Sequence, residues 1–109
     1  MAIPHASPGQ PIDVRPLGPA IARARTAALF KTEQIEVMRL VLPAGKSVPS
    51  HKVAGEITIQ CLEGKVELTA GGRSQLLCAG ELLYLSGGVP HSLLAIGDAS
   101  ALVTIVLAR

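Results

Sequence analysis

The chain has 109 residues, of which 49% are apolar and 17% are charged, and its net charge is +2. One folded domain is the natural expectation for this length and composition. The ten basic and eight acidic residues are scattered without a basic run, which argues against nucleic acid as a partner. One Phe, one Tyr and no Trp leave few flat faces on which sugars or unpaired bases could stack.

The sequence has no features of membrane insertion or export. No apolar run reaches the roughly 18 residues of a membrane span, and the first residues lack the regions of a signal peptide. We therefore expect a soluble, cytoplasmic protein without a membrane partner. Cys61 and Cys78 are too far apart for a C-x-x-C motif, and we interpret both as small, buried hydrophobic residues.

Residues 1–22 are predicted to form a proline-rich arm. Five of the eight prolines lie within the first 20 residues. Because proline fixes φ and lacks an N–H donor, the arm is expected to be extended rather than packed as a regular element. It either stays disordered or lies across the rest of the chain or a partner subunit.

Residues 23–109 are predicted to form one all-β domain. Short apolar runs alternate with turn residues at a spacing of about ten, which is typical of a sandwich or barrel, and no window has a helical period. The segment 43–50 has the composition of a turn. The expected strands are 26–32, 34–42, 56–63, 65–70, 74–79, 82–85, 91–96 and 101–108.

Two of the expected strands, 34–42 and 101–109, are apolar on nearly both faces. A small barrel has only one inside, so apolar surface on the outside must be covered by the arm or by a second subunit. We interpret this pattern as a homodimer.

The segment 45–64 follows the spaced pattern G-x5-H-x-H-x3-E-x6-G only in part. Gly45, His51 and Gly64 occupy their positions, whereas Val53 stands at the second His position and Ile57 at the Glu position.

A second pattern, G-x5-P-x-G-x2-H-x3-N, is matched by Gly80, Gly88 and His91, with Ser86 at the Pro position and Ala95 at the Asn position. On these two motifs the chain resembles a small, single-domain cupin of the RmlC-like kind over roughly residues 34–107. The resemblance implies a double-stranded β-helix, that is, a jelly-roll barrel. It also implies, ordinarily, one Fe, Mn, Ni or Zn ion held by three His and one Glu.

The chain retains only part of that ligand set. The even offsets of a strand place His51, Val53, Ile57, Ile59 and, further along, Cys61 on one inward face. Of these, only His51 can ligate at the level of the metal, and His91 would meet it from across the barrel. Two imidazoles leave a first-row metal with half its usual ligands, and aliphatic neighbours disfavour a solvated ion. We therefore expect no strongly held metal and no other cofactor.

Glu56 could complete a set of two His and one carboxylate. It lies one residue before the Glu position, so a regular strand would direct it to the opposite face. A β-bulge at Gly55 would turn it inward.

Three functions stay open on this basis, and whether the protein is an enzyme is not decided. The first is a small-molecule-binding barrel with His51 and His91 as polar contacts. Val53, Ile57 and Ile59, with Met38 and Cys61 further off, would line its apolar pocket. The second is a mononuclear metal-dependent cupin enzyme, such as an oxygenase, isomerase or decarboxylase-like protein, as the resemblance implies. The third is a structural or regulatory dimer whose barrel is filled by side chains.

Overall fold

The computed structural model describes residues 5–107, and β-strands are the main regular elements after the N-terminal arm. The arm contains a 3-10 helix, η1, which spans Gly18–Arg23. No helix of the described residues is long and apolar enough to cross a membrane. The strands are β1 (Ala27–Lys31), β2 (Ile35–Leu42), β3 (Ser47–His51), β4 (Ile57–Glu63), β5 (Lys65–Ala70), β6 (Arg73–Cys78), β7 (Leu82–Leu85), β8 (His91–Ala95) and β9 (Ala99–Val106).

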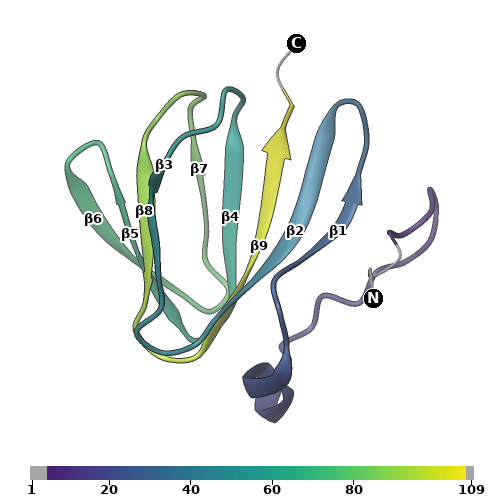
Figure 1. The fold of residues 1–109 in the computed structure, drawn as a ribbon, viewed down its shortest axis with the longest axis horizontal. Helices are drawn as coiled ribbons and strands as arrows, with labels where there is room; N and C mark the ends of the chain where they lie inside the picture. The colour runs from purple at the N-terminus through teal and green to yellow at the C-terminus, as the bar shows by residue number, and fades with distance from the viewer. Residues whose placement is uncertain (1–4, 108–109) are drawn as a thin grey trace.

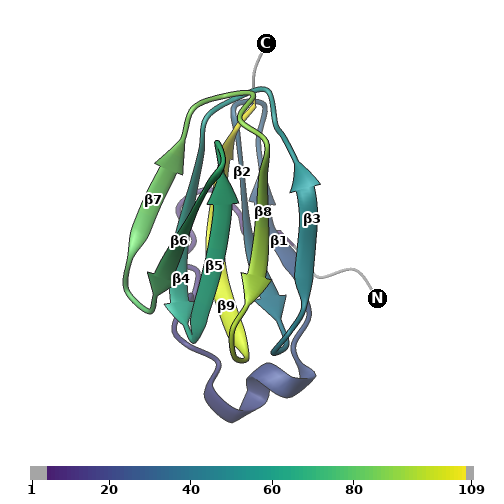
Figure 2. The same ribbon diagram turned by 90° about the vertical axis from the view of Figure 1, so that its left-hand side faces the viewer.

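The strands form two antiparallel sheets that face each other (Figures 1 and 2). One sheet has the order β1-β2-β9-β4-β7 and the other has the order β3-β8-β5-β6. The chain passes from one sheet to the other between most successive strands, as from β2 to β3, β3 to β4, β7 to β8 and β8 to β9. This crossing pattern is that of a jelly roll, so the predicted all-β double-stranded β-helix is confirmed.

The core lies between the two sheets and follows the alternation of each strand. In β4, Ile57, Ile59 and Cys61 are at most 3% exposed and point into the core, while Thr58 and Gln60 between them lie on the other face. Full burial of an aliphatic side chain stabilises the fold by about 1.5–3 kcal/mol. The other core residues are Leu42, Val66, Leu68, Leu77, Leu93, Ala95, Ala99, Ala101 and Val103.

Strand β3 lies largely within the segment 43–50, which the sequence predicted as a turn, so that prediction is wrong for its second half. Pro49 and the polar side chains gave the segment the composition of a loop. β3 is an edge strand with an irregular register between Val48 and His51. Proline is tolerated at such a place because no ladder hydrogen bond is required there.

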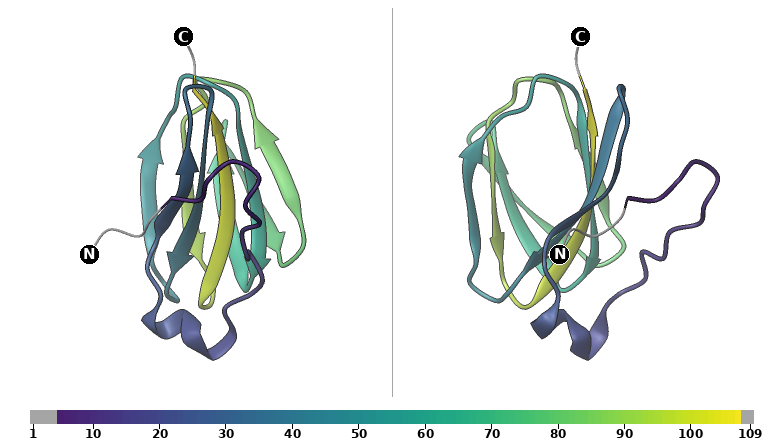
Figure 3. Two further views of the ribbon diagram at one scale, coloured as in Figure 1. Left: turned by 90° about the vertical axis from the view of Figure 1, so that its right-hand side faces the viewer. Right: turned by 45° about the vertical axis from the view of Figure 1, so that its right-hand side comes forward.

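The arm lies across the outer side of the five-stranded sheet, as the left view of Figure 3 shows. On the outer face of β2, Val37 and Val41 are at most 9% exposed, and Arg39 between them is only 8% exposed. Nη2 of Arg39 donates to the backbone oxygen of Asp13 at 3.2 Å. Much of the apolar outer surface of β2 is therefore covered within the same chain. The boundary predicted between residues 22 and 23 falls inside η1, so the arm is packed and partly helical rather than only extended.

Candidate functional site

The two motif histidines lie side by side at one end of the barrel. His51 ends β3, His91 begins β8, and the two are paired in the register of these strands. Their ring centroids are 4.5 Å apart and the ring planes are inclined by 52°. The imidazoles are therefore brought together by the pairing of two adjacent strands of one sheet. They do not meet from opposite sides of the barrel, as the sequence analysis expected.

Each imidazole is held by the carbonyl group two residues before it. Nδ1 of His51 lies 3.1 Å from the oxygen of Pro49, and Nδ1 of His91 lies 3.0 Å from the oxygen of Val89. Because a carbonyl oxygen can only accept, Nδ1 must carry the hydrogen in both rings. In the neutral form, Nε2 then carries a lone pair in each ring. The pair therefore offers two hydrogen-bond acceptors, or two metal ligands.

The surroundings of the pair are apolar on the inner side and open on the outer side. His91 is 2% exposed, whereas His51 is exposed at the edge of its sheet. Val53 packs against the core, and Ile57 and Ile59 belong to it. Five depressions stand out on the described surface, and neither histidine lines any of them. The candidate site therefore lies at the mouth of the barrel, between the apolar core and the solvent.

Two loops meet beside the histidines, and glycines permit their close approach. The N–H of Gly88 donates to the oxygen of Val53 at 2.8 Å, joining the β7–β8 loop to the β3–β4 loop. A Cβ on Gly87 would lie 2.2 Å from the oxygen of Ala54. A Cβ on Gly55 would lie even closer to the backbone oxygen of Val106, so no side chain fits there.

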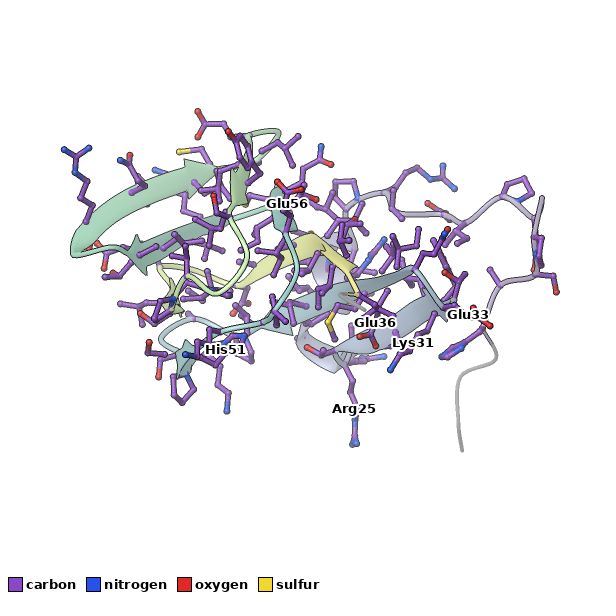
Figure 4. The ribbon with its side chains drawn as sticks, turned by 90° about the horizontal axis from the view of Figure 1, so that it is seen from above. Arg25, Lys31, Glu33, Glu36, His51 and Glu56 are labelled. Atoms are coloured by element: carbon purple, nitrogen blue, oxygen red, sulfur yellow. The ribbon has the colours of Figure 1, made fainter. Side chains whose placement is uncertain are left out.

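The structure does not bring Glu56 to the histidines. Glu56 is exposed, and together with Thr58, Tyr84 and Thr104 it lines a depression on the outer face of the five-stranded sheet. Figure 4 shows it well apart from His51. No group of three His, Cys, Asp or Glu side chains within residues 5–107 is arranged to hold a metal ion. The alternative in which a bulge at Gly55 turns Glu56 inward is therefore wrong, because Gly55 serves the backbone contact with β9 instead.

Two charged residues that the sequence analysis did not select lie on the inward faces of the sheets, Glu36 on β2 and Arg73 on β6. Glu36 is paired with Ile105 and shares the inward face of β2 with Met38, which packs against the core. Arg73 is paired with Ala70, the residue of β5 that is also paired with His91. The alternation in residues 36–42 could have indicated that Glu36 faces inward with Met38. The sequence analysis interpreted this segment only as a strand that is apolar on nearly both faces.

Glu63, the last residue of β4, anchors the arm. Its carboxylate accepts the N–H groups of Leu17 and Gly18 at 2.8 and 3.0 Å and the hydroxyl of Ser100. Partial burial alone would raise the pKa of Glu63, but these hydrogen bonds and the charge of Arg39 outweigh it and lower the pKa. Glu63 therefore has a structural role away from the histidines.

The cysteines differ in their surroundings. Cys61 is fully buried, its Sγ lies 3.4 Å from the backbone oxygens of Glu63 and Gly64, and burial raises the pKa of its thiol. Cys78 is only partly buried. The prediction of a buried residue is confirmed for Cys61 and holds only in part for Cys78.

Comparison with known proteins now identifies the family. The model of the family described as "Cupin domain" matches residues 38–107, and the chain belongs to this family. A search of curated proteins finds no match.

Solved structures similar to the chain share its fold and differ in what is known of them. An RmlC-like cupin protein from Desulfovibrio desulfuricans is 27% identical, with a TM-score of 0.68 over 74% of this chain and 79% of that one. A conserved protein of unknown function from Streptococcus pyogenes is 16% identical, with a TM-score of 0.77 over 100% of this chain and 96% of the other. The DMSP lyase DddQ from Ruegeria pomeroyi is 21% identical, with a TM-score of 0.69 over 74% of this chain and 45% of its own.

Proposed function

We propose that the protein binds a small molecule at the mouth of its barrel, with His51 and His91 as the polar contacts. The observation that carries this proposal is the pairing of the two imidazoles at 4.5 Å, each with Nδ1 committed to a backbone carbonyl. Both Nε2 atoms are thereby left for a ligand, and a neutral pair of this kind suits a ligand with a hydrogen-bond donor. The apolar residues around the pair suit a ligand with an apolar body.

The side chains around the pair do not fit the usual cupin metal. That ion would be held by three His and one Glu, but Val53 and Ile57 stand at two of those four positions. Aliphatic side chains provide no ligand and exclude the waters that would have to replace one. We therefore propose binding without a strongly held ion, and we derive no reaction step through a metal.

One observation favours a metal-dependent enzyme as the second candidate. Metal-ligating histidines usually donate their other ring N–H to a carbonyl or carboxylate, and both histidines of this chain do so. The experiment is metal analysis of protein purified without an affinity tag and then equilibrated separately with Fe, Mn, Ni and Zn. Near-stoichiometric metal that is lost in a His51→Ala, His91→Ala double variant, but retained in a His5→Ala control, would replace our proposal with the second candidate.

Two probes that differ in the presence of a hydrogen-bond donor test the binding proposal directly. Phenol carries a donor on an apolar ring, and anisole has the same ring without the donor. We expect phenol, but not anisole, to shift the imidazole ¹⁵N resonances of His51 and His91. We also expect His51→Ala to weaken phenol binding about tenfold. Equal effects of the two probes, or an unchanged affinity for phenol in His51→Ala, would contradict the proposal.

A further inference from the structure

A cleft opens at the side of the barrel between β6 and β7. It has a volume of about 440 Å³, which is within the usual range for a small-molecule site. Both bordering strands are the last in their sheets, so the backbone N–H groups on their outer sides lack a ladder partner. The floor is formed by inward apolar residues of both sheets, namely Leu68, Ala70, Leu77, Leu83 and Leu85.

The cleft has a cationic end and an anionic end. Arg73 and Gln75 are paired with Ala70 and Leu68, so their side chains share the face that borders the cleft. Glu81 lines the cleft close to the other end of β6, where its Oε1 accepts the N–H of Cys78 at 2.7 Å. Cys78 lies five positions after Arg73 along the strand, which is about 17 Å at the usual rise. A small ligand placed at Arg73 is therefore remote from the acidic end.

Arg73 is not engaged elsewhere in the described chain. It is exposed, and no hydrogen bond or ion pair holds its guanidinium to another residue of the range 5–107. The ion pair between Arg15 and Asp13 lies in the arm and does not involve Arg73. A free guanidinium with five donors matches a carboxylate in a bidentate manner, and the amide of Gln75 adds a donor on the same side.

From this arrangement we infer that the cleft is a second binding site, for an organic carboxylate with an apolar body. The carboxylate is bound by Arg73 and Gln75, and the apolar body lies on the inward residues Leu68, Leu77, Leu83 and Leu85. Glu81 disfavours the opposite orientation because it would repel the carboxylate. This inference goes beyond the proposed function, because the site forms without any contribution from His51.

The test uses hexanoate as the probe and 1-hexanol as the matched neutral molecule. Backbone ¹H–¹⁵N shifts are followed during titration of the full chain at pH 7. We expect hexanoate to shift the amides of Ala70, Gln75 and Leu83. We expect Arg73→Gln to weaken its binding at least about tenfold, and Arg73→Lys to weaken it less, because a charge-assisted bidentate contact is lost or only reduced.

Controls separate this site from general charge attraction and from the histidine pair. Arg23→Gln, which removes a cation from η1, should leave hexanoate binding unchanged. An equal loss in Arg23→Gln, equal binding of hexanoate and 1-hexanol, or no shift at the cleft amides would overturn the inference. If hexanoate binding is retained in Arg73→Gln while phenol still shifts the imidazoles of His51 and His91, the cleft site fails and the histidine site stands. Binding of hexanoate through Arg73 without any effect of phenol on the imidazoles would support the cleft and contradict the proposed function.

Discussion

Replacing Glu63 by Gln tests whether one carboxylate fastens the arm to the barrel. The change retains the size of the side chain and a neutral acceptor but removes the charge that receives the Leu17, Gly18 and Ser100 donors. A hydrogen bond to a charged group is worth about 1.5–3 kcal/mol, and a neutral one about 1 kcal/mol. With partial exposure of Glu63 taken into account, we expect the free energy of unfolding to fall by about 1–2 kcal/mol at pH 7.

The pH dependence of this effect has a fixed sign. The pKa of Glu63 is lower in the folded protein than its ordinary value, so its contribution is fully present above that ordinary value, which is about 4.3. The contribution is lost as the pH falls below about 4.3 and through the lowered pKa of the folded state. The difference in stability between the wild type and Glu63→Gln should therefore shrink on acidification over this range and stay constant between pH 6 and pH 8.

Urea unfolding at a series of pH values measures this difference, and amide hydrogen exchange locates it. Exchange at Leu17 and Gly18 should accelerate in Glu63→Gln, whereas exchange at Ala24, whose N–H bonds within η1 to Ile21, should change less. The matched control is Glu67→Gln on the outer side of β5. Equal stability of the two variants, together with unchanged exchange at Leu17 and Gly18, would refute the reasoning.

Two further predictions concern the loops at the mouth and the outer face of the sheet. Gly87→Ala should lower the free energy of unfolding by about 1–3 kcal/mol, because the added Cβ would overlap the oxygen of Ala54. Gly97→Ala is the control, since a Cβ at Gly97 meets open space and should change the free energy of unfolding little. Urea unfolding of both variants measures the difference. We still expect a homodimer, now through the exposed Leu82 and Tyr84 (60% and 70%). Sedimentation should show a monomer after Leu82→Glu, and a monomeric wild type at micromolar concentration would contradict this prediction.

The sequence predicted the barrel well because its signals are local. Alternation placed Ile57, Ile59 and Cys61 on one face, and this face is the core. Glycine spacing placed the turns, several of which contain a glycine with positive φ, such as Gly45 and Gly64. Strand β3 was missed because an edge strand needs neither apolar alternation nor a complete set of N–H donors.

The site was harder to predict because strand pairing places residues that are distant in the sequence. The sequence indicated that His51 and His91 share one site, but not that each ring is fixed by the carbonyl group two residues before it. The role of Glu63 depends on an arm that is 45 residues or more away in the chain. Neither its sequence neighbours nor a motif could indicate that contact.

The two proposed sites meet at Ala70, and this determines how they should be separated. Ala70 is the cross-strand partner of both His91 and Arg73, so the Cα atoms of those two residues are about 10 Å apart at the usual strand spacing. Substitutions this close need not have additive effects on binding. A His91→Gln, Arg73→Gln double-mutant cycle for 6-hydroxyhexanoate, which has a donor at one end and a carboxylate at the other, resolves the matter. Coupling seen with 6-hydroxyhexanoate but not with hexanoate means that one ligand spans both groups, whereas additivity with 6-hydroxyhexanoate means that the mouth and the side cleft bind independently.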